Sequence, residues 1–169
     1  DEQGDDRLGL AGSSYQMLVT GVLAGRPPRV DFELERGVQQ LLRQAIAAGL
    51  LASAHDSSDG GLAVALAESS IASALGVELK ISGRSEGLAR TLFAEGGARV
   101  AISVKAECRP QWDQLAAEST VPITELGAVS DGSTFRIHCG QKDVELSLAD
   151  LKRAHQEGLP RRIGGEAES

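Results

Sequence analysis

Residues 53–64, with the sequence SAHDSSDGGLAV, contain residue types whose spacing suits a phosphate site. The apolar stretch 50–55 predicts a buried strand, a polar glycine-containing turn follows it, and an Ala-rich helix is expected from residue 62. Gly60 and Gly61 allow the backbone to come close to a ligand and to adopt positive φ. The start of the helix offers free N–H groups and a partial positive charge. The segment therefore predicts an anion site, most simply for phosphate.

The polar side chains of this turn allow two interpretations. His55, Ser57 and Ser58 are candidate phosphate donors, whereas Asp56 and Asp59 would repel a bare phosphate and favour Mg²⁺ held between carboxylate and phosphate. In the structural alternative, Ser58 or Asp59 caps the helix, the glycine pair permits tight packing, and His55 is a hydrogen-bonded histidine at a strand end. The segment is not a P-loop, because no GK[ST] follows the glycines.

Helices and strands alternate along the chain and would position this turn. Helices are expected at about 14–24, 31–48, 62–75, 86–93, 110–118 and 147–157, and strands at 50–55, 77–81, 99–104, 123–129, 135–138 and 144–146. The pattern predicts an α/β (α+β) fold in which helices cover a sheet, with an antiparallel hairpin appended. Residues 1–169 are expected to form a single domain with an ordered core at about 8–160 and frayed polar ends. The absence of an initial Met suggests an excised domain or a mature product, and the polar tail suggests a true C-terminus.

Two helix starts have clear signals. Ser13 with Gln16 fits a capping box, and Asp31 fits an N-cap. The helix after Asp31 has a one-sided apolar stripe and Gly49 as its stop, while Gly76 is the expected stop of the helix 62–75. The stripe comprises Leu34, Val38, Leu41, Leu42, Ala45 and Ile46, of which Leu41, Leu42 and Ile46 are predicted to be buried.

Composition excludes several classes of function. The net charge of −7 argues against a nucleic-acid binder and against docking on an anionic membrane surface. No apolar run approaches the roughly 20 residues that span a bilayer. Cys108 and Cys139 have no metal-ligand spacing and are interpreted as reduced cytoplasmic thiols without a catalytic role.

Five segments together resemble one enzyme family. SAHDSSDGGLAVALAE (53–68) closely resembles the signature of the last domain in the large, PurL-type subunit of formylglycinamidine ribonucleotide (phosphoribosylformylglycinamidine) synthase. The other segments resemble that family in the same order and extend the match over about residues 8–160. They are LGLAGSSYQ (8–16), GRPPRVDFELERGVQQLL (25–42), LFAEGGARVAISV (92–104) and LSLADLKRAHQEGLP (146–160).

The resemblance implies a fold and an activity. The fold is a three-layer α/β/α domain with a mixed, partly ferredoxin-like sheet, as in the C-terminal domain of aminoimidazole ribonucleotide synthase. The family's enzymes convert formylglycinamide ribonucleotide to the amidine with ATP, Mg²⁺ and glutamine-derived ammonia, by way of an iminophosphate. The implied partners are the nucleotide-binding domains of the same subunit, a glutaminase subunit or domain, and a small accessory subunit, all cytoplasmic. The isolated domain is expected to be inactive and to need no cofactor.

The sequence departs from the family at a second loop. Both serines of the LFSES-like turn are replaced, which leaves Glu95, Gly96 and Gly97 as candidate contacts through a carboxylate and backbone N–H groups. A lone carboxylate such as Glu95 is typically a surface or helix-capping residue. Two alternatives stay open: the domain belongs to an auxiliary, non-catalytic nucleotide-holding site of the same enzyme, or to another ATP-using member of the superfamily.

Overall fold

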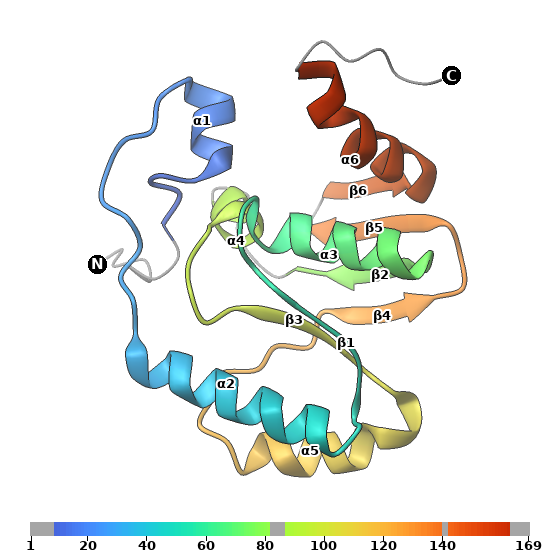
Figure 1. Ribbon diagram of the computed structural model, residues 1–169. Coiled ribbons are helices and arrows are strands. Elements are labelled where there is room, and N and C mark those ends of the chain that lie inside the picture. The colour runs from blue at the N-terminus through green and yellow to red at the C-terminus, as the bar shows by residue number, and fades with distance from the viewer. Residues whose placement is uncertain (1–8, 82–86, 140–141, 163–169) are drawn as a thin grey trace. The chain divides into compact units, whose positions relative to one another are not determined.

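The computed structural model describes residues 9–81, 87–139 and 142–162 (Figure 1). The chain divides into two compact units. The first contains Asp1–Leu66 and Ser85–Glu125, and the second contains Ala67–Arg84 and Leu126–Ser169. The polar ends that were predicted to fray lie largely outside the described residues, and the prediction of a single domain stays a prediction.

The first unit contains a two-stranded ribbon and several helices. β1 pairs with β3 in an antiparallel arrangement that places His55 opposite Ala101. The elements are α1 (Ser14–Thr20), α2 (Phe32–Ala47), β1 (Leu51–Asp56), the first turns of α3 (Gly61–Ser73), α4 (Leu88–Phe93), β3 (Val100–Val104), the 3₁₀ turn η1 (Ala106–Cys108) and α5 (Arg109–Ala117).

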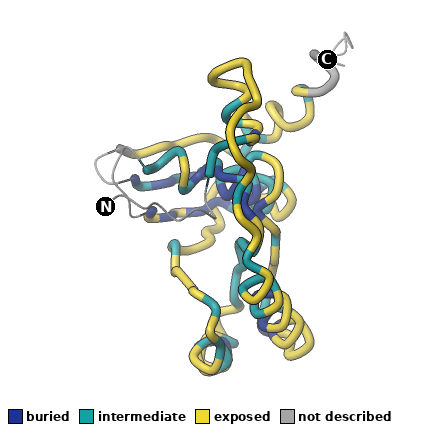
Figure 2. Tube along the Cα trace, turned by 90° about the vertical axis from the view of Figure 1, so that its left-hand side faces the viewer, coloured by how far each residue is buried: buried dark blue, intermediate teal, exposed yellow. Residues whose placement is uncertain are grey.

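At the start of α1, Ser13 is the N-cap as predicted, but the second bond of the capping box comes from Gly12 instead of Ser13, and the end of the helix also differs. The Gln16 backbone N–H donates to Ser13 Oγ (3.1 Å), and Gln16 Oε1 accepts from the Gly12 N–H (2.9 Å). The helix ends at Thr20 rather than near residues 24–25, because Gly21 adopts left-handed φ of 73°. Most of the chain from Met17 to Phe32 is exposed (Figure 2).

The apolar stripe of α2 is narrower than predicted. Val38, Leu41 and Ala45 are buried, Leu42 is half-buried, and Ile46 is 59% exposed. The prediction that Ile46 lies on the buried face is therefore wrong, since that residue is turned about 100° from Ala45 around the helix axis. α2 packs against α5 (Figure 1), with a core of Leu41, Ala45, Leu50 and Trp112.

β1 is a strand as predicted, although it is not buried. Leu51 and His55 are half-buried and the other four residues are exposed. β1 carries a core on one face and, within the described part of the chain, pairs with β3 alone, so much of its surface stays accessible.

The second unit is built on a mixed sheet of β2 (Gly76–Lys80), β4 (Gly127–Ser130), β5 (Thr134–Cys139) and β6 (Lys142–Ser147), followed by α6 (Leu148–Arg162). The strand order is β4-β2-β5-β6, with β2 and β5 parallel and the other pairs antiparallel. The predicted hairpin is thus part of the main sheet. The predicted strand at 123–129 is reduced to Gly127–Ser130, the length that pairs with β2. One face is apolar and buried, through Val77, Leu79, Ile81, Phe135 and Ile137.

The opposite face of this sheet is charged. His138 Nδ1 lies 2.9 Å from Asp143 Oδ1, and its Nε2 lies 3.3 Å from Glu78 Oε1. The hydrogen bond with Asp143, and then that with Glu78, raises the pKa of His138. Arg136 pairs with Glu145 on β6 at 2.8 Å.

The ends of α3 and α6 differ from the sequence predictions. α3 ends at Ser73 because Ala74 has a left-handed φ of 55°, while Gly76 belongs to β2 and not to a helix stop. A Cβ on Gly76 would lie 2.6 Å from the Thr134 carbonyl oxygen. At α6 the predicted cap is confirmed, since Ser147 Oγ accepts from the Asp150 N–H (3.0 Å), but the helix continues past residue 157.

Candidate functional site

The predicted strand–turn–helix segment is present in the first unit. β1 ends at Asp56, the Ser57 N–H donates to the Arg99 carbonyl (2.8 Å), and the Gly61 N–H donates to the Ser58 carbonyl (3.0 Å). Gly60 and Gly61 both have left-handed φ, at 80° and 71°. The backbone of this turn therefore requires glycine at two successive positions.

The glycine pair has a clear packing role. A Cβ on Gly61 would lie 2.8 Å from the Leu92 carbonyl oxygen and from the backbone of Phe93, at the end of α4. A Cβ on Gly60 would overlap the Val64 side chain. These contacts support the structural interpretation of the two glycines and leave a ligand role untested.

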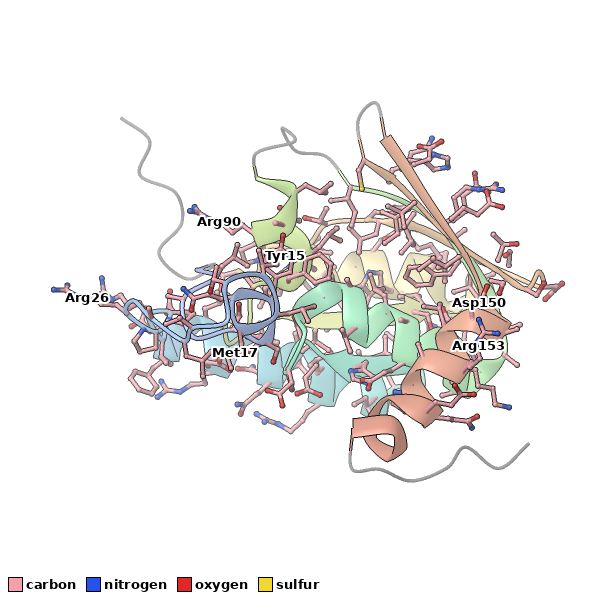
Figure 3. The ribbon with its side chains drawn as sticks, turned by 90° about the horizontal axis from the view of Figure 1, so that it is seen from above. Tyr15, Met17, Arg26, Arg90, Asp150 and Arg153 are labelled. Atoms are coloured by element: carbon pink, nitrogen blue, oxygen red, sulfur yellow. The ribbon has the colours of Figure 1, made fainter. Side chains whose placement is uncertain are left out.

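Glu95 brings the second loop to the first. One carboxylate oxygen, Oε1, accepts from the Gly60 N–H (2.7 Å) and from the Ser14 N–H (2.8 Å). Gly60 precedes α3 and Ser14 is the first residue of α1, so the residue acts as a shared acceptor at two helix starts. Beside it, the Tyr15 and Phe93 rings stack with centroids 4.8 Å apart (Tyr15 is labelled in Figure 3). The carboxylate thus lies where the sequence predicted an external anion.

The other predicted residues lie around the end of β1. The Ser58 hydroxyl donates to the Asp56 carboxylate, and this bond is the main reason why the pKa of Asp56 is lowered. His55 Nδ1 lies 2.8 Å from the Asp56 carbonyl oxygen, the hydrogen bond expected of a structural strand-end histidine. Asp59 is exposed. Within the described part of the chain, no three His, Cys, Asp or Glu side chains cluster as metal ligands.

An open groove of about 420 Å³ lies beside this turn. Its lining includes all three residues of the second loop and three residues of the first, and one cationic side chain, Arg99. The full lining is Glu35, Val38, Gln39, Leu42, Asp56, Ser57, Ser58, Glu95, Gly96, Gly97, Ala98, Arg99 and Val100.

Arg99 is the groove residue that sequence reasoning missed as a site residue. Its Nη2 donates to the Thr91 carbonyl (2.9 Å), and burial lowers the pKa of its guanidinium. The available signal was an arginine two residues after the glycines of the second loop, in the sequence EGGAR. His138 and His155 lie outside the groove, as does Cys139, and Cys108 packs against the core of the first unit.

The fold and this turn define a class, the mixed α/β domains in which a strand enters a helix through a glycine pair. The family described as "AIR synthase related protein, C-terminal domain" matches residues 4–140. The chain belongs to this family, and the predicted resemblance and fold class are confirmed.

Similar relatives include PurL subunits of phosphoribosylformylglycinamidine synthase. One from Parasynechococcus marenigrum (strain WH8102) is 93% identical over 100% of this chain and 22% of its own length. One from Synechococcus sp. (strain WH7803) is 55% identical over 97% of the chain and 22% of its length. The chain therefore spans about a fifth of the length of these relatives.

Solved structures give the same fold at low sequence identity. "Structure of PurLQS from Thermotoga maritima" has a TM-score of 0.58 and 16% identity, covering 83% of this chain and 24% of that one. "T. maritima PurL complexed with FGAR" has a TM-score of 0.56 and 17% identity, covering 69% of this chain and 20% of that one. Among the described residues, no helix is long and apolar enough to cross a membrane.

Proposed function

We propose that this chain is the C-terminal domain of a PurL-type subunit of phosphoribosylformylglycinamidine synthase, an ATP-dependent C–N ligase of purine biosynthesis. The observation that carries the proposal is the 93% identity with such a subunit over the whole chain. The reaction joins ammonia to formylglycinamide ribonucleotide and consumes ATP. The isolated domain is expected to be inactive, because the chain spans 22% of the length of such a subunit.

Within the complete enzyme, this domain contributes the turn 55–61 and the adjoining groove to a ligand site. Asp56 and Asp59 are the side chains that would hold Mg²⁺, and the ion would offset the negative charge of a bound phosphate. The donor set fits this role, because the Asp56 carboxylate is 75% exposed and its lowered pKa keeps it ionised. His55, Ser57 and Ser58 lie at the same strand end and supply hydrogen-bonding groups.

The partners are the nucleotide-binding domains of the same subunit, a glutaminase, and a small accessory subunit, in the cytoplasm. One structural neighbour is itself described as PurLQS, which supports an assembly of several components. Two other neighbours are described as complexes with ATP and AMPPCP, which supports ATP as the nucleotide.

A second candidate is that this copy of the domain belongs to an auxiliary site without catalysis. The observation that favours it is the Glu95 carboxylate bonded to the Gly60 N–H at 2.7 Å. An internal carboxylate at the helix start reduces the attraction of that position for a substrate phosphate.

Asp59→Asn in the full-length subunit separates the two candidates. Asn keeps the shape of the side chain and removes its charge, so a catalytic Mg²⁺ site should lose more than about tenfold in kcat with an unchanged Tm. The matched control is Asp131→Asn, an exposed turn residue of the second unit. Turnover at the wild-type level in Asp59→Asn would contradict the catalytic Mg²⁺ site and support the auxiliary role. A wild-type subunit that forms no amidine from the ribonucleotide, ATP and ammonia would overturn the proposed function.

A further inference from the structure

Two side chains that line the groove contain buried polar atoms without a partner. In the described part of the chain, Ser57 Oγ and Arg99 Nη1 are both inaccessible and make no hydrogen bond. Ser57 as a whole is only 6% exposed. Buried donors in folded proteins are almost always paired, because an unpaired one loses its bonds to water without replacement. The two unpaired donors among the lining residues are therefore candidates for binding a group that the described chain does not supply.

The position of Arg99 is fixed by the backbone. Its Nη2 donates to Thr91 O on α4 (2.9 Å), and its own carbonyl accepts from the Ser57 N–H (2.8 Å). The second bond ties the two residues together at the ends of β1 and β3. Among the described residues, no carboxylate lies within ion-pair distance of the guanidinium. The charge is therefore held in place without an internal counter-ion.

Three carboxylates line the groove: Glu95 and Asp56 accept hydrogen bonds from the chain, whereas Glu35 on α2 lies beside Gly97. Glu95 accepts from two backbone N–H groups, and Asp56 accepts from Ser58 and is 75% exposed to water. Arg99 is the cationic side chain among the lining residues. An anionic ligand group is thus favoured at Arg99 and not at the start of α3, where Glu95 already lies.

We infer that Arg99 and Ser57 bind a phosphate group of a ligand in this groove. Nη1 offers two N–H donors and the Ser57 hydroxyl a third, and phosphate oxygens can accept from all of them. The choice of phosphate rests on the proposed function, since both the nucleotide and the ribonucleotide substrate carry it. This assignment moves the expected phosphate from the Gly60–Gly61 backbone to a side-chain site that faces α2.

The test is ligand binding by the full-length subunit, measured by calorimetry with formylglycinamide ribonucleotide and with ADP·Mg²⁺. Arg99→Gln should raise the Kd of one of these ligands at least tenfold, and Ser57→Ala should raise the Kd of the same ligand severalfold. Arg90→Gln is the matched control, because Arg90 on α4 is exposed and its side chain extends outward from the helix (Figure 3). It should leave both dissociation constants unchanged.

The outcomes separate the two phosphate sources and the two proposals. A change confined to the ribonucleotide assigns the groove to substrate, and a change confined to ADP assigns it to nucleotide. If Arg99→Gln does not fold, the dissociation constants of Arg99→Lys and Ser57→Ala test the inference instead. Wild-type affinity for both ligands in the folded variants overturns the inference. If Arg99→Gln loses ligand binding while the wild-type subunit forms no amidine, the anion site is supported and the proposed function is contradicted.

Discussion

Removal of the Glu95 carboxylate tests the central contact of the site. In Glu95→Ala, the Gly60 N–H loses a part-buried charged acceptor at 2.7 Å, and the Ser14 N–H loses an exposed one at 2.8 Å. The first loss is worth about 1.5–3 kcal/mol and the second about 0.5–1 kcal/mol. The favourable field at the start of α3 adds about 0.3–1 kcal/mol. We therefore expect the free energy of unfolding to fall by about 2–5 kcal/mol.

Glu95→Gln divides this loss into its parts. The amide oxygen can still accept a hydrogen bond, whereas the charge is gone, so the expected loss is about 1 kcal/mol. Urea denaturation of the 169-residue chain, followed by tryptophan fluorescence, measures both values. Trp112 is the single tryptophan and is 6% exposed in the core of the first unit, so its emission reports the loss of that core.

Glu107→Ala serves as the control, because Glu107 is an exposed acidic residue of the same unit. A loss below about 1 kcal/mol in Glu95→Ala would show that the two bonds are weak. Wild-type stability in Glu95→Gln would show that the charge contributes nothing at the helix start. Either result would refute the role of Glu95 as an internal anion.

Three further predictions concern packing, backbone and charge. Leu41→Ala should lower the free energy of unfolding in urea by about 2–5 kcal/mol, because Leu41 is buried. Ile46→Ala should lower it by less than about 1 kcal/mol, because Ile46 is exposed. Equal losses would contradict the assigned buried face of α2. Gly61→Ala should destabilise the chain by more than Gly21→Ala in the same assay, because both have left-handed φ but only Gly61 has backbone within 2.8 Å of the added Cβ. His138→Gln should lower the Tm more at about pH 5.5 than at about pH 8.5, because the pKa of His138 is raised in the folded state. Such a group stabilises the fold below its unfolded-state pKa, and this stability is lost as the pH rises through its folded-state pKa. A change in Tm that does not depend on pH would exclude this linkage.

The sequence predicted those features that depend on neighbours along the chain. The caps at Ser13, Asp31 and Ser147 were correct, because each requires only a side chain and an N–H three residues later. The positive φ values of Gly60 and Gly61 followed from the same local reasoning. The strand–turn–helix order around the candidate site therefore follows from short-range sequence signals alone.

The sequence predictions were wrong where contacts between distant segments determine burial or hydrogen bonding. Ile46 is exposed because α5 covers only a narrow stripe of α2. α3 ends at Ser73 because Ala74 has left-handed φ, which alanine rarely adopts. Gly60→Val, which would block the approach of a ligand to the turn, would also strain the backbone and overlap Val64. The Glu95 contacts and the unpaired Nη1 of Arg99 have no signature in periodicity or local composition.

The single acceptor at Glu95 also constrains how the chain folds. Its oxygen binds residues that lie 81 and 35 positions from Glu95, so three segments must meet before both bonds are present. The closure of long loops costs entropy that is recovered only when the contacts are complete. Folding can therefore begin with local elements such as α2. We expect the turn that carries the candidate site to reach its final geometry late, because its contacts join segments that are distant in the sequence and form slowly.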